Sequence, residues 1–189
     1  WAELAERLRL PLVVAEAGPD ASAWQGGSYK SFHYALGELH HYQELLLHAR
    51  PQSILLWEYT ADYGVLDTVT GSDGKPTLVE TPRYWFQAQW CNLTPHNSEA
   101  LGSGSDSANV LLTAFRGPDG GPLVLHLSNP GAARQACVRG LPAGLGRLRM
   151  IHSGRAAGLV EGPPVQVDNG VAIIDLPAQS MVTLTTAER

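Results

Sequence analysis

The chain has 189 residues, of which 44% are hydrophobic and 16% are charged, and this composition excludes a disordered polypeptide. A formal net charge of −5 gives no electrostatic basis for binding nucleic acid or an anionic membrane surface. No apolar run approaches the roughly 20 residues needed to span a bilayer, and the length suits one or two domains with a sizeable core.

Residues 1–9 are predicted to form an amphipathic helix, with Trp1, Leu4 and Leu8 on one face and Pro11 ending it. The sequence thus opens inside a helix, without an initiator Met or a signal-peptide pattern. We expect it to be a piece of a longer protein or a processed product.

A short apolar strand is predicted next, over residues 12–16. Its lack of alternation is typical of a strand covered on both faces, as in a parallel sheet packed between helices. It ends on Glu16, and Ala17 and Gly18 begin a turn. At the carboxyl end of a strand in a (β/α) barrel, an acidic residue indicates chemistry, so Glu16 is the first candidate catalytic residue. The alternative is a solvated loop residue or a helix-capping acid.

A loop over residues 18–27 and a long helix follow. Trp24 is a large apolar ring in this polar loop, where it either folds back on its surroundings or offers a flat platform to a ligand. Ser28 is the expected N-cap of a helix over residues 29–49.

The run of residues 53–59 repeats this plan, because a helix and Pro51 precede a short apolar strand that ends in Trp57, Glu58 and Tyr59. Two successive helix–strand units predict a parallel sheet with crossover connections. The first part of the chain is therefore expected to be α/β.

A loop over residues 60–75 comes next, and Pro82 is placed to open a short helix over residues 83–91. Residues 98–107 are a polar, Gly/Ser-rich connection. After it, turn signals separate seven short apolar runs, which predict an antiparallel β-sandwich: residues 110–115, 123–127, 135–138, 148–151, 165–167, 171–176 and 180–185. The expected domains are residues 1–97 and 108–189, with 98–107 as a linker.

Metal binding is not favoured by the residues that could provide ligands. His40 and Glu44 lie one turn apart in the long helix, but no H-E-x-x-H motif is present, so a solvated face is preferred. Cys91 and Cys137 lack metal spacing and are interpreted as two buried thiols, with one disulfide as the alternative. We expect no metal and no cofactor.

The order of these elements resembles the C-terminal part of a clan A retaining glycoside hydrolase. The resemblance rests on an apolar strand ending Ala-Glu-Ala-Gly, a long helix, a strand ending Leu-Trp-Glu-Tyr, a Thr-Pro-Arg-Tyr-Trp helix start and a following sandwich. It implies the last strands and helices of a (β/α)8 TIM barrel followed by an antiparallel β-sandwich, as in glucosylceramidase-, xylosidase-, arabinofuranosidase- and heparanase-like families. It covers essentially the whole chain.

The resemblance implies Glu16 as the nucleophile and Trp57 as a wall under the sugar. Trp24, Tyr59 and Tyr63 are further candidates for substrate binding, by stacking or hydrogen bonding. Tyr29 is interpreted as a rim tyrosine with its hydroxyl in water.

The resemblance also implies an acid/base residue on a preceding strand, usually in an Asn-Glu pair, and no such dipeptide occurs here. Alternation along the strand would point Glu58 away from a pocket that Trp57 faces, so we expect Glu58 to be structural and paired with Arg83. An N-terminal barrel segment or a second chain must then provide the acid. The expected partners are this segment and a carbohydrate substrate, with export from the cytoplasm favoured.

Two other functions are weighed against a glycosidase. The first is a non-catalytic carbohydrate- or protein-binding module, although Phe115 is the only aromatic residue after Trp90 and sugar platforms need exposed rings. The second is another barrel enzyme with Glu16 as a general base, but no phosphate-binding Gly loop is present. His126 and His152 lie in apolar runs and are expected to be core or edge histidines.

Overall fold

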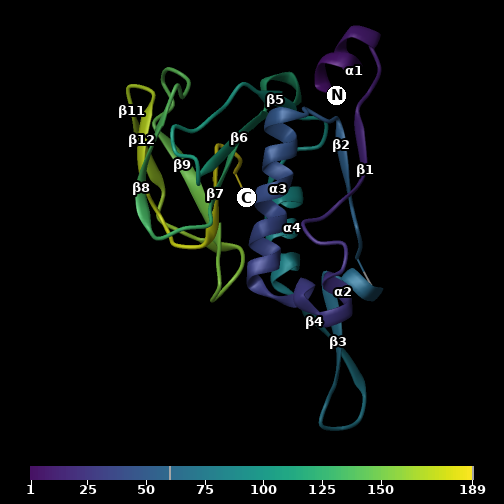
Figure 1. Ribbon diagram of the computed structural model, residues 1–189. Helices are drawn as coiled ribbons and strands as arrows, with labels where there is room; N and C mark the ends of the chain where they lie inside the picture. Colours follow the sequence, from purple (N-terminus) through teal and green to yellow (C-terminus); the bar gives the residue numbers. More distant parts are fainter. Residues whose placement is uncertain (60, 189) are drawn as a thin grey trace. The chain divides into compact units, whose positions relative to one another are not determined.

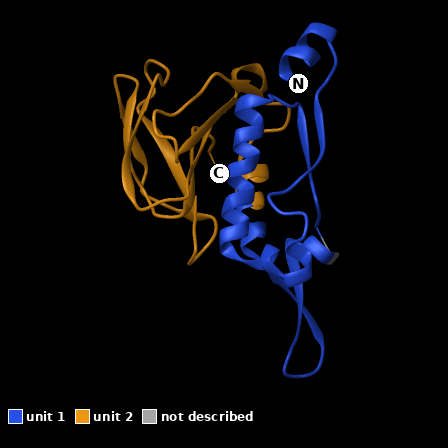
Figure 2. Ribbon diagram, viewed as in Figure 1, with its two compact units in different colours: residues 1–86 blue, residues 87–189 orange. Residues whose placement is uncertain are grey.

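The computed structural model describes residues 1–59 and 61–188, which form two compact units, Trp1–Phe86 and Gln87–Arg189 (Figures 1 and 2). The division falls within helix α4 (Pro82–Leu93), so its first turns belong to unit 1 and the rest to unit 2. None of the described helices is both long and apolar enough to cross a membrane.

Unit 1 contains two pairs of strands and several helices. Its helical elements are α1 (Ala2–Leu8), α2 (Ala23–Gly26), η1 (Ser28–Lys30), α3 (Phe32–His48), η2 (Ala61–Tyr63) and the start of α4. Its strands are β1 (Val13–Ala17), β2 (Ser53–Leu56), β3 (Leu66–Thr70) and β4 (Pro76–Glu80). Strands β1 and β2 are parallel and α3 connects them, which confirms the α/β prediction.

The prediction that the first strand is covered on both faces is wrong for this chain. The side chains of Val13 in β1 and Leu55 in β2 are 49% and 52% exposed. The reason is that, within the described residues, each of these strands has the other as its only sheet neighbour.

Helix α3 begins later than the sequence suggested. Its N-cap is Ser31, whose Oγ accepts a hydrogen bond from the backbone N–H of Tyr34 at 3.1 Å. The expected cap, Ser28, instead begins the 3-10 turn η1. The buried face of α3 is mostly apolar but also contains the fully buried Glu38.

An antiparallel hairpin, β3–β4, replaces the loop that was expected over residues 60–75. Its register runs from Leu66 opposite Glu80 to Thr70 opposite Pro76, and the hairpin projects from the rest of unit 1 (Figure 1). The base of the hairpin is closed by Thr81, whose N–H and Oγ1 donate to the carbonyl of Val65 at 3.0 and 2.7 Å. Thr60, the first residue of the expected loop, lies outside the described residues.

Unit 2 is an antiparallel β-sandwich, as predicted. Its described strands are β5 (Glu99–Leu101), β6 (Leu111–Arg116), β7 (Leu123–Asn129), β8 (Arg134–Arg139), β9 (Arg147–Ser153), β10 (Val160–Glu161), β11 (Val165–Asp168), β12 (Val171–Leu176) and β13 (Ser180–Thr185), with a 3-10 turn η3 (Pro118–Gly120). They are ordered β5-β6-β7-β13-β9-β11-β12-β8, with β10 beside β9.

One apolar core holds the two layers of the sandwich together. Leu125 and Leu127 from β7 and Val182 and Leu184 from β13 belong to the same buried cluster as residues of β8, β11 and β12. Strands β5 and β10 were not predicted, because each is only two or three residues long and neither carries an apolar run. Strand β5 lies within residues 98–107, the expected linker. The expected domain boundaries at residues 97 and 108 stay a prediction.

The outer face of this sheet carries a buried polar group centred on His126. The two ring nitrogens of His126 lie 2.8 Å from Thr94 Oγ1 and 2.9 Å from Thr183 Oγ1, and Trp90 of α4 stacks on the ring at 4.6 Å. Burial lowers the pKa of His126 to about 3, so the ring is neutral. The prediction that His126 is a core histidine with hydrogen-bond partners is confirmed. The prediction of two buried thiols is wrong, because Cys91 and Cys137 are free and exposed.

Candidate active site

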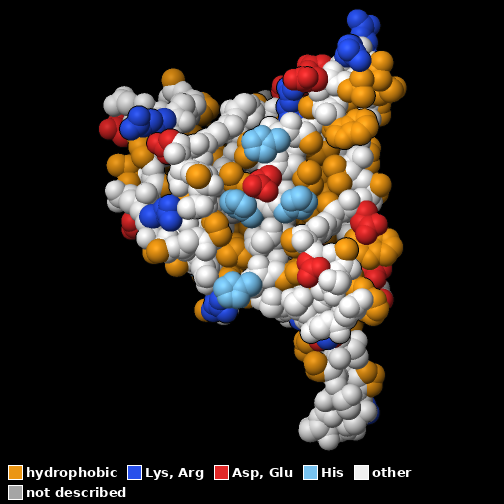
Figure 3. Space-filling model, in the orientation of Figure 1, with side chains coloured by type: hydrophobic (Ala, Val, Ile, Leu, Met, Phe, Trp, Pro, Cys, Tyr) orange, Lys and Arg blue, Asp and Glu red, His pale blue; other side chains and the backbone are white. Residues whose placement is uncertain are grey.

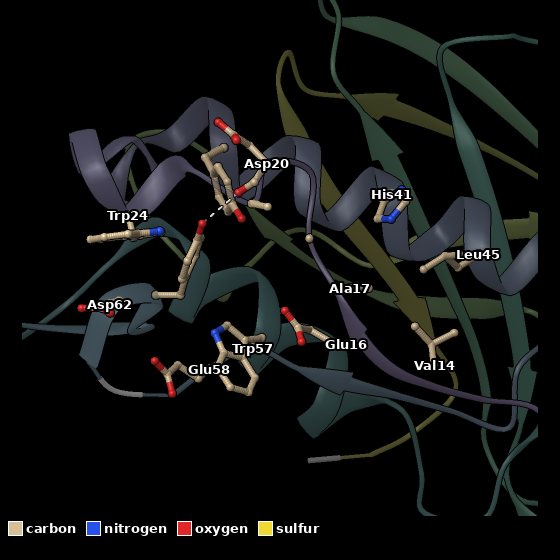
Figure 4. A pocket seen from close by; sticks show the side chains of 14 residues that line it. Val14, Glu16, Ala17, Asp20, Trp24, His41, Leu45, Trp57, Glu58 and Asp62 are labelled. Atoms are coloured by element: carbon tan, nitrogen blue, oxygen red, sulfur yellow. Dashed lines mark hydrogen bonds between the residues drawn. The ribbon is translucent and has the colours of Figure 1, made fainter.

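An open hollow of about 790 Å³ lies at the carboxyl ends of β1 and β2 in unit 1 (Figure 4). Parallel strands bring their carboxyl ends to the same edge of a sheet, so the segments that follow β1 and β2 meet there. The residues that line the hollow are Val14, Glu16, Ala17, Gly18, Asp20, Ala21, Trp24, Tyr34, His41, Leu45, Trp57, Glu58, Asp62 and Tyr63.

Glu16 lies on the wall of this hollow with an exposed side chain. Figure 4 shows its carboxylate directed toward the indole of Trp57, which is itself 49% exposed. The structure therefore brings together the acidic residue next to the end of the first strand and the aromatic residue that follows the second.

Glu58 differs from its prediction in two respects. It lines the hollow together with Trp57, and the peptide bond between the two residues is cis. Moreover, the carboxylate partner of Arg83 is not Glu58 but Glu38, at 2.7 Å. Strand alternation does not apply to Glu58, because β2 already ends at Leu56.

The other predicted binding residues divide into two groups. Trp24 and Tyr63 line the hollow, and the Tyr63 hydroxyl donates to the carbonyl of Asp20 at 3.0 Å. Tyr59 is 65% exposed and is not part of the lining. Tyr29 is not a rim residue, since it is buried with its ring 5.4 Å from that of Tyr63.

Four of the polar lining residues were not singled out in the sequence: Asp20, Tyr34, His41 and Asp62. Hydrogen bonds from the backbone and side chain of Ser22 lower the pKa of Asp20. Burial and the neighbouring Glu38 raise the pKa of Tyr34 to about 12, which keeps its hydroxyl protonated. The Gly-Pro-Asp turn directly after the first strand was the available signal for Asp20.

The charge of the hollow is one-sided. Glu16, Asp20, Glu58 and Asp62 contribute carboxylates, and the lining contains no Lys or Arg among the described residues. Such a surface can hold hydroxyl groups as hydrogen-bond donors, and its exposed indoles can stack on an apolar ring face.

No group of three or more His, Cys, Asp or Glu among residues 1–59 and 61–188 is arranged to hold a metal ion. Figure 3 shows histidine side chains gathered on one face of the molecule, with a carboxylate among them, where α3 runs in Figure 1. Helix α3 contains both His40 and Glu44, the pair considered above as ligands.

No protein-family model and no curated protein sequence matches the chain. Solved structures do match it. A GH30 endoxylanase from Clostridium papyrosolvens superposes with a TM-score of 0.76 at 16% identity, and a glycoside hydrolase family 30 subfamily 8 xylanase from Clostridium acetobutylicum with 0.78 at 12%. A GH51 α-L-arabinofuranosidase from Thermotoga petrophila superposes with 0.61 at 16%.

Each of these matches covers 97% of this chain but only 44% of the other chain. The chain thus spans less than half the length of these glycoside hydrolases. It has the fold of their C-terminal portion, in which the last strands and helices of a (β/α)8 barrel are followed by a β-sandwich. This confirms the resemblance at the level of the fold.

Proposed function

We propose that this chain is the C-terminal portion of a retaining glycosidase, with Glu16 as the nucleophile. The observation that carries the proposal is the placement of Glu16 and Trp57 on one hollow, at the carboxyl ends of neighbouring parallel strands. Catalytic residues of (β/α)8 enzymes come from this end of the strands. The fold shared with xylanases and an arabinofuranosidase supports a carbohydrate substrate.

The chemistry proceeds in two displacements. In the first, a carboxylate oxygen of Glu16 attacks the anomeric carbon, the bond to the leaving oxygen breaks, and a carboxylic acid protonates that oxygen. In the second, a water molecule gives its proton to the same acid residue, attacks the anomeric carbon and releases Glu16. One water is consumed for each glycosidic bond. Trp57 and Trp24 stack on sugar rings, and Tyr63 lies beside them on the wall.

The acid/base residue comes from a preceding barrel segment or from a second chain. A retaining enzyme needs this carboxyl group about 5–5.5 Å from the nucleophile. The native mass of the purified protein tests the source. A species well above 20.3 kDa that releases a different chain on denaturation supports a two-chain barrel. If a lone 20.3 kDa monomer hydrolyses glycosides, then neither a preceding segment nor a second chain is needed to provide the acid/base residue, and this part of the proposal is wrong.

Covalent labelling of the complete enzyme tests the nucleophile. A 2-deoxy-2-fluoro xyloside with a good leaving group should trap a glycosyl ester on Glu16, which peptide mass spectrometry locates. Glu16→Gln should lose labelling and at least about a thousandfold in kcat, in keeping with the loss of a covalent catalytic group. Azide should restore turnover to Glu16→Ala and yield a glycosyl azide of inverted configuration.

Glu58→Gln is the matched control, because it removes a neighbouring carboxylate from the same hollow. It should remain labelled on Glu16. A label on Glu58, or full activity in Glu16→Gln, would show that the nucleophile has been assigned to the wrong residue.

The alternative of a binding module built on the sandwich has little support. The two aromatic residues of unit 2, Trp90 and Phe115, both pack around His126: Phe115 is buried, and one face of the Trp90 indole is stacked on the histidine ring. Stacking platforms for carbohydrates need such rings on the surface.

A further inference from the structure

A buried ion pair lies behind the hollow. The side chains of Arg83, on α4, and Glu38, on α3, are 0% and 1% exposed. Arg83 Nε donates to Glu38 Oε2 at 2.8 Å, and Nη2 donates to Oε1 at 2.7 Å. This bidentate geometry fixes the plane of the guanidinium group.

The other donors of Arg83 reach the backbone that follows β2. Nη2 also donates to the carbonyl of Trp57 at 3.0 Å, and Nη1 donates to the carbonyl of Tyr63. One guanidinium group therefore holds two lining residues by their main chain. The same group lies 5.6 Å from the centre of the Tyr34 ring, another part of the lining.

The network continues to the first strand through Tyr42. The hydroxyl of this buried residue lies 3.1 Å from the carbonyl of Ala17 and 3.3 Å from Glu38 Oε1, so its single proton is shared between two acceptors. Ala17 is the residue after Glu16. Burial raises the pKa of Tyr42, and the hydroxyl therefore stays a donor at every pH at which a glycosidase works.

A purely stabilising role accounts poorly for this arrangement. Desolvation of two charges offsets most of their attraction, so a buried ion pair adds little stability compared with apolar residues of similar volume. What the pair provides, and apolar residues do not, is a set of directed bonds to Trp57, Tyr63 and, through Tyr42, Ala17.

We propose that Arg83, Glu38 and Tyr42 are positioning residues, which hold Trp57 at a fixed place relative to Glu16. This inference rests on the proposed function of Glu16. None of the three side chains lines the hollow, so they act through the residues that do. Displacement of a reacting group by about 1 Å can cost about a hundredfold in rate, which is why such a frame matters.

Two variants of the complete enzyme test the proposal, with Ile174→Val in the sandwich core as the control for a general loss of stability. Tyr42→Phe removes one hydroxyl and leaves the ion pair. Arg83→Lys keeps the charge but loses the forked geometry. Each should lower kcat, and the rate of Glu16 labelling, by about tenfold or more, with KM within about twofold of the wild-type value. Ile174→Val should leave both rates unchanged.

The outcomes separate this proposal from the one on which it rests. If the wild type is labelled on Glu16 and both variants react at the wild-type rate, the positioning role is refuted and the nucleophile stands. If the wild type is not labelled on Glu16, the proposed function fails. Fluorine NMR of 5-fluorotryptophan protein then decides the positioning role: the Trp57 signal, assigned with Trp57→Phe, should shift in Arg83→Lys and not in Ile174→Val. An unshifted signal would overturn the proposal.

Discussion

At the level of single residues, the charge of Arg83 depends on Glu38 for its neutralisation. Burial alone would lower the pKa of Arg83, but the hydrogen bonds and charge of Glu38 outweigh it and raise the pKa. Removing one partner therefore leaves an uncompensated charge in a place without solvent, whereas removing both does not.

We expect Arg83→Met to lower the free energy of unfolding by about 3–5 kcal/mol, since it strands the carboxylate of Glu38. Adding Glu38→Met should recover part of this loss but not all of it, because the carbonyls of Trp57 and Tyr63 still lack the donors that Arg83 provides. Urea unfolding of the two single variants and the double variant, arranged as a double-mutant cycle, measures the coupling. Additive losses would mean that the pair is not coupled in solution.

His126 makes the stability of unit 2 dependent on pH. Its pKa is about 3 in the folded protein and 6.5 in an ordinary environment. Between about pH 3 and pH 6.5, His126 therefore binds a proton in the unfolded chain and not in the folded chain. The contribution of His126 is complete above that pH and is lost progressively as the pH falls toward 3.

We expect His126→Gln, which cannot titrate, to flatten the dependence of Tm on pH between pH 6.5 and pH 4. The variant loses stacking on Trp90, so its Tm at pH 7.5 should be lower than that of the wild type. Calorimetry across this range measures both effects. Parallel curves for the two proteins would show that the ring is not held neutral.

At the level of elements, the β3–β4 hairpin is separable from the body of unit 1. Leu78 is 65% exposed and Val69 41%, so the arm buries little apolar surface. Below it, Val65 and Thr81 are buried and hydrogen-bonded to each other. The residues that stabilise unit 1 therefore lie at the base of the β3–β4 hairpin, and not in its projecting part.

Replacing residues 68–78 by an Asn-Gly turn should change Tm by no more than about 4 °C, which corresponds to about 1 kcal/mol in a domain of this size. Thermal unfolding followed by far-UV circular dichroism measures the shift. A drop of 10 °C or more would mean that the arm packs against something that holds unit 1 together.

At the level of the whole molecule, the two units differ in how completely their sheets are formed. Strand β13 has a neighbour on each side, whereas β1 and β2 have only each other among the described strands. Backbone groups on an open edge are exposed to solvent, and such segments open at low free energy.

Hydrogen exchange of the isolated chain should therefore show amides of β1 and β2 exchanging at least about a hundredfold faster than those of β7 and β13. If the proposed barrel segment is added, hydrogen exchange should slow in β1 and β2 and not in β7 and β13. Equal protection in the isolated chain would indicate that β1 and β2 already have a partner, such as a second copy.

The sequence predicted those parts of the fold that carry their own periodicity or turn chemistry. The run over residues 180–185 is the strand β13 to the residue, because apolar and β-branched residues dominate it and a turn precedes it. The β3–β4 hairpin was missed because polar residues interrupt both strands, most of their side chains are exposed, and the Leu and Val residues do not alternate with polar ones. Its pairing comes from the closure at Val65 and Thr81, which no local pattern records.

The residues of the candidate site that lie at strand ends could be predicted from the sequence. Those that reach the hollow from the segments between strands and helices could not. Glu16 lies near the carboxyl end of β1 and Trp57 directly follows the parallel strand β2, so their meeting could be expected from the sequence. Asp62 reaches the hollow from the short 3-10 turn η2, for which the sequence carries no comparable signal. The partner of Arg83 was misassigned to Glu58. The available signal for Glu38 was its place four residues before Tyr42, on the buried face of the long helix.

The central place of β13 in its sheet has a consequence for how unit 2 is made. This strand lies between β7 and β9, yet it leaves the ribosome after all the other described strands of the unit. Until residues 180–185 emerge, β7 and β9 lack the neighbour that joins them, and the apolar faces around Val182 and Leu184 stay uncovered. Truncation before residue 180 thus removes the middle of the sandwich, and leaves a chain that is a substrate for chaperones and proteases rather than a shortened but folded domain.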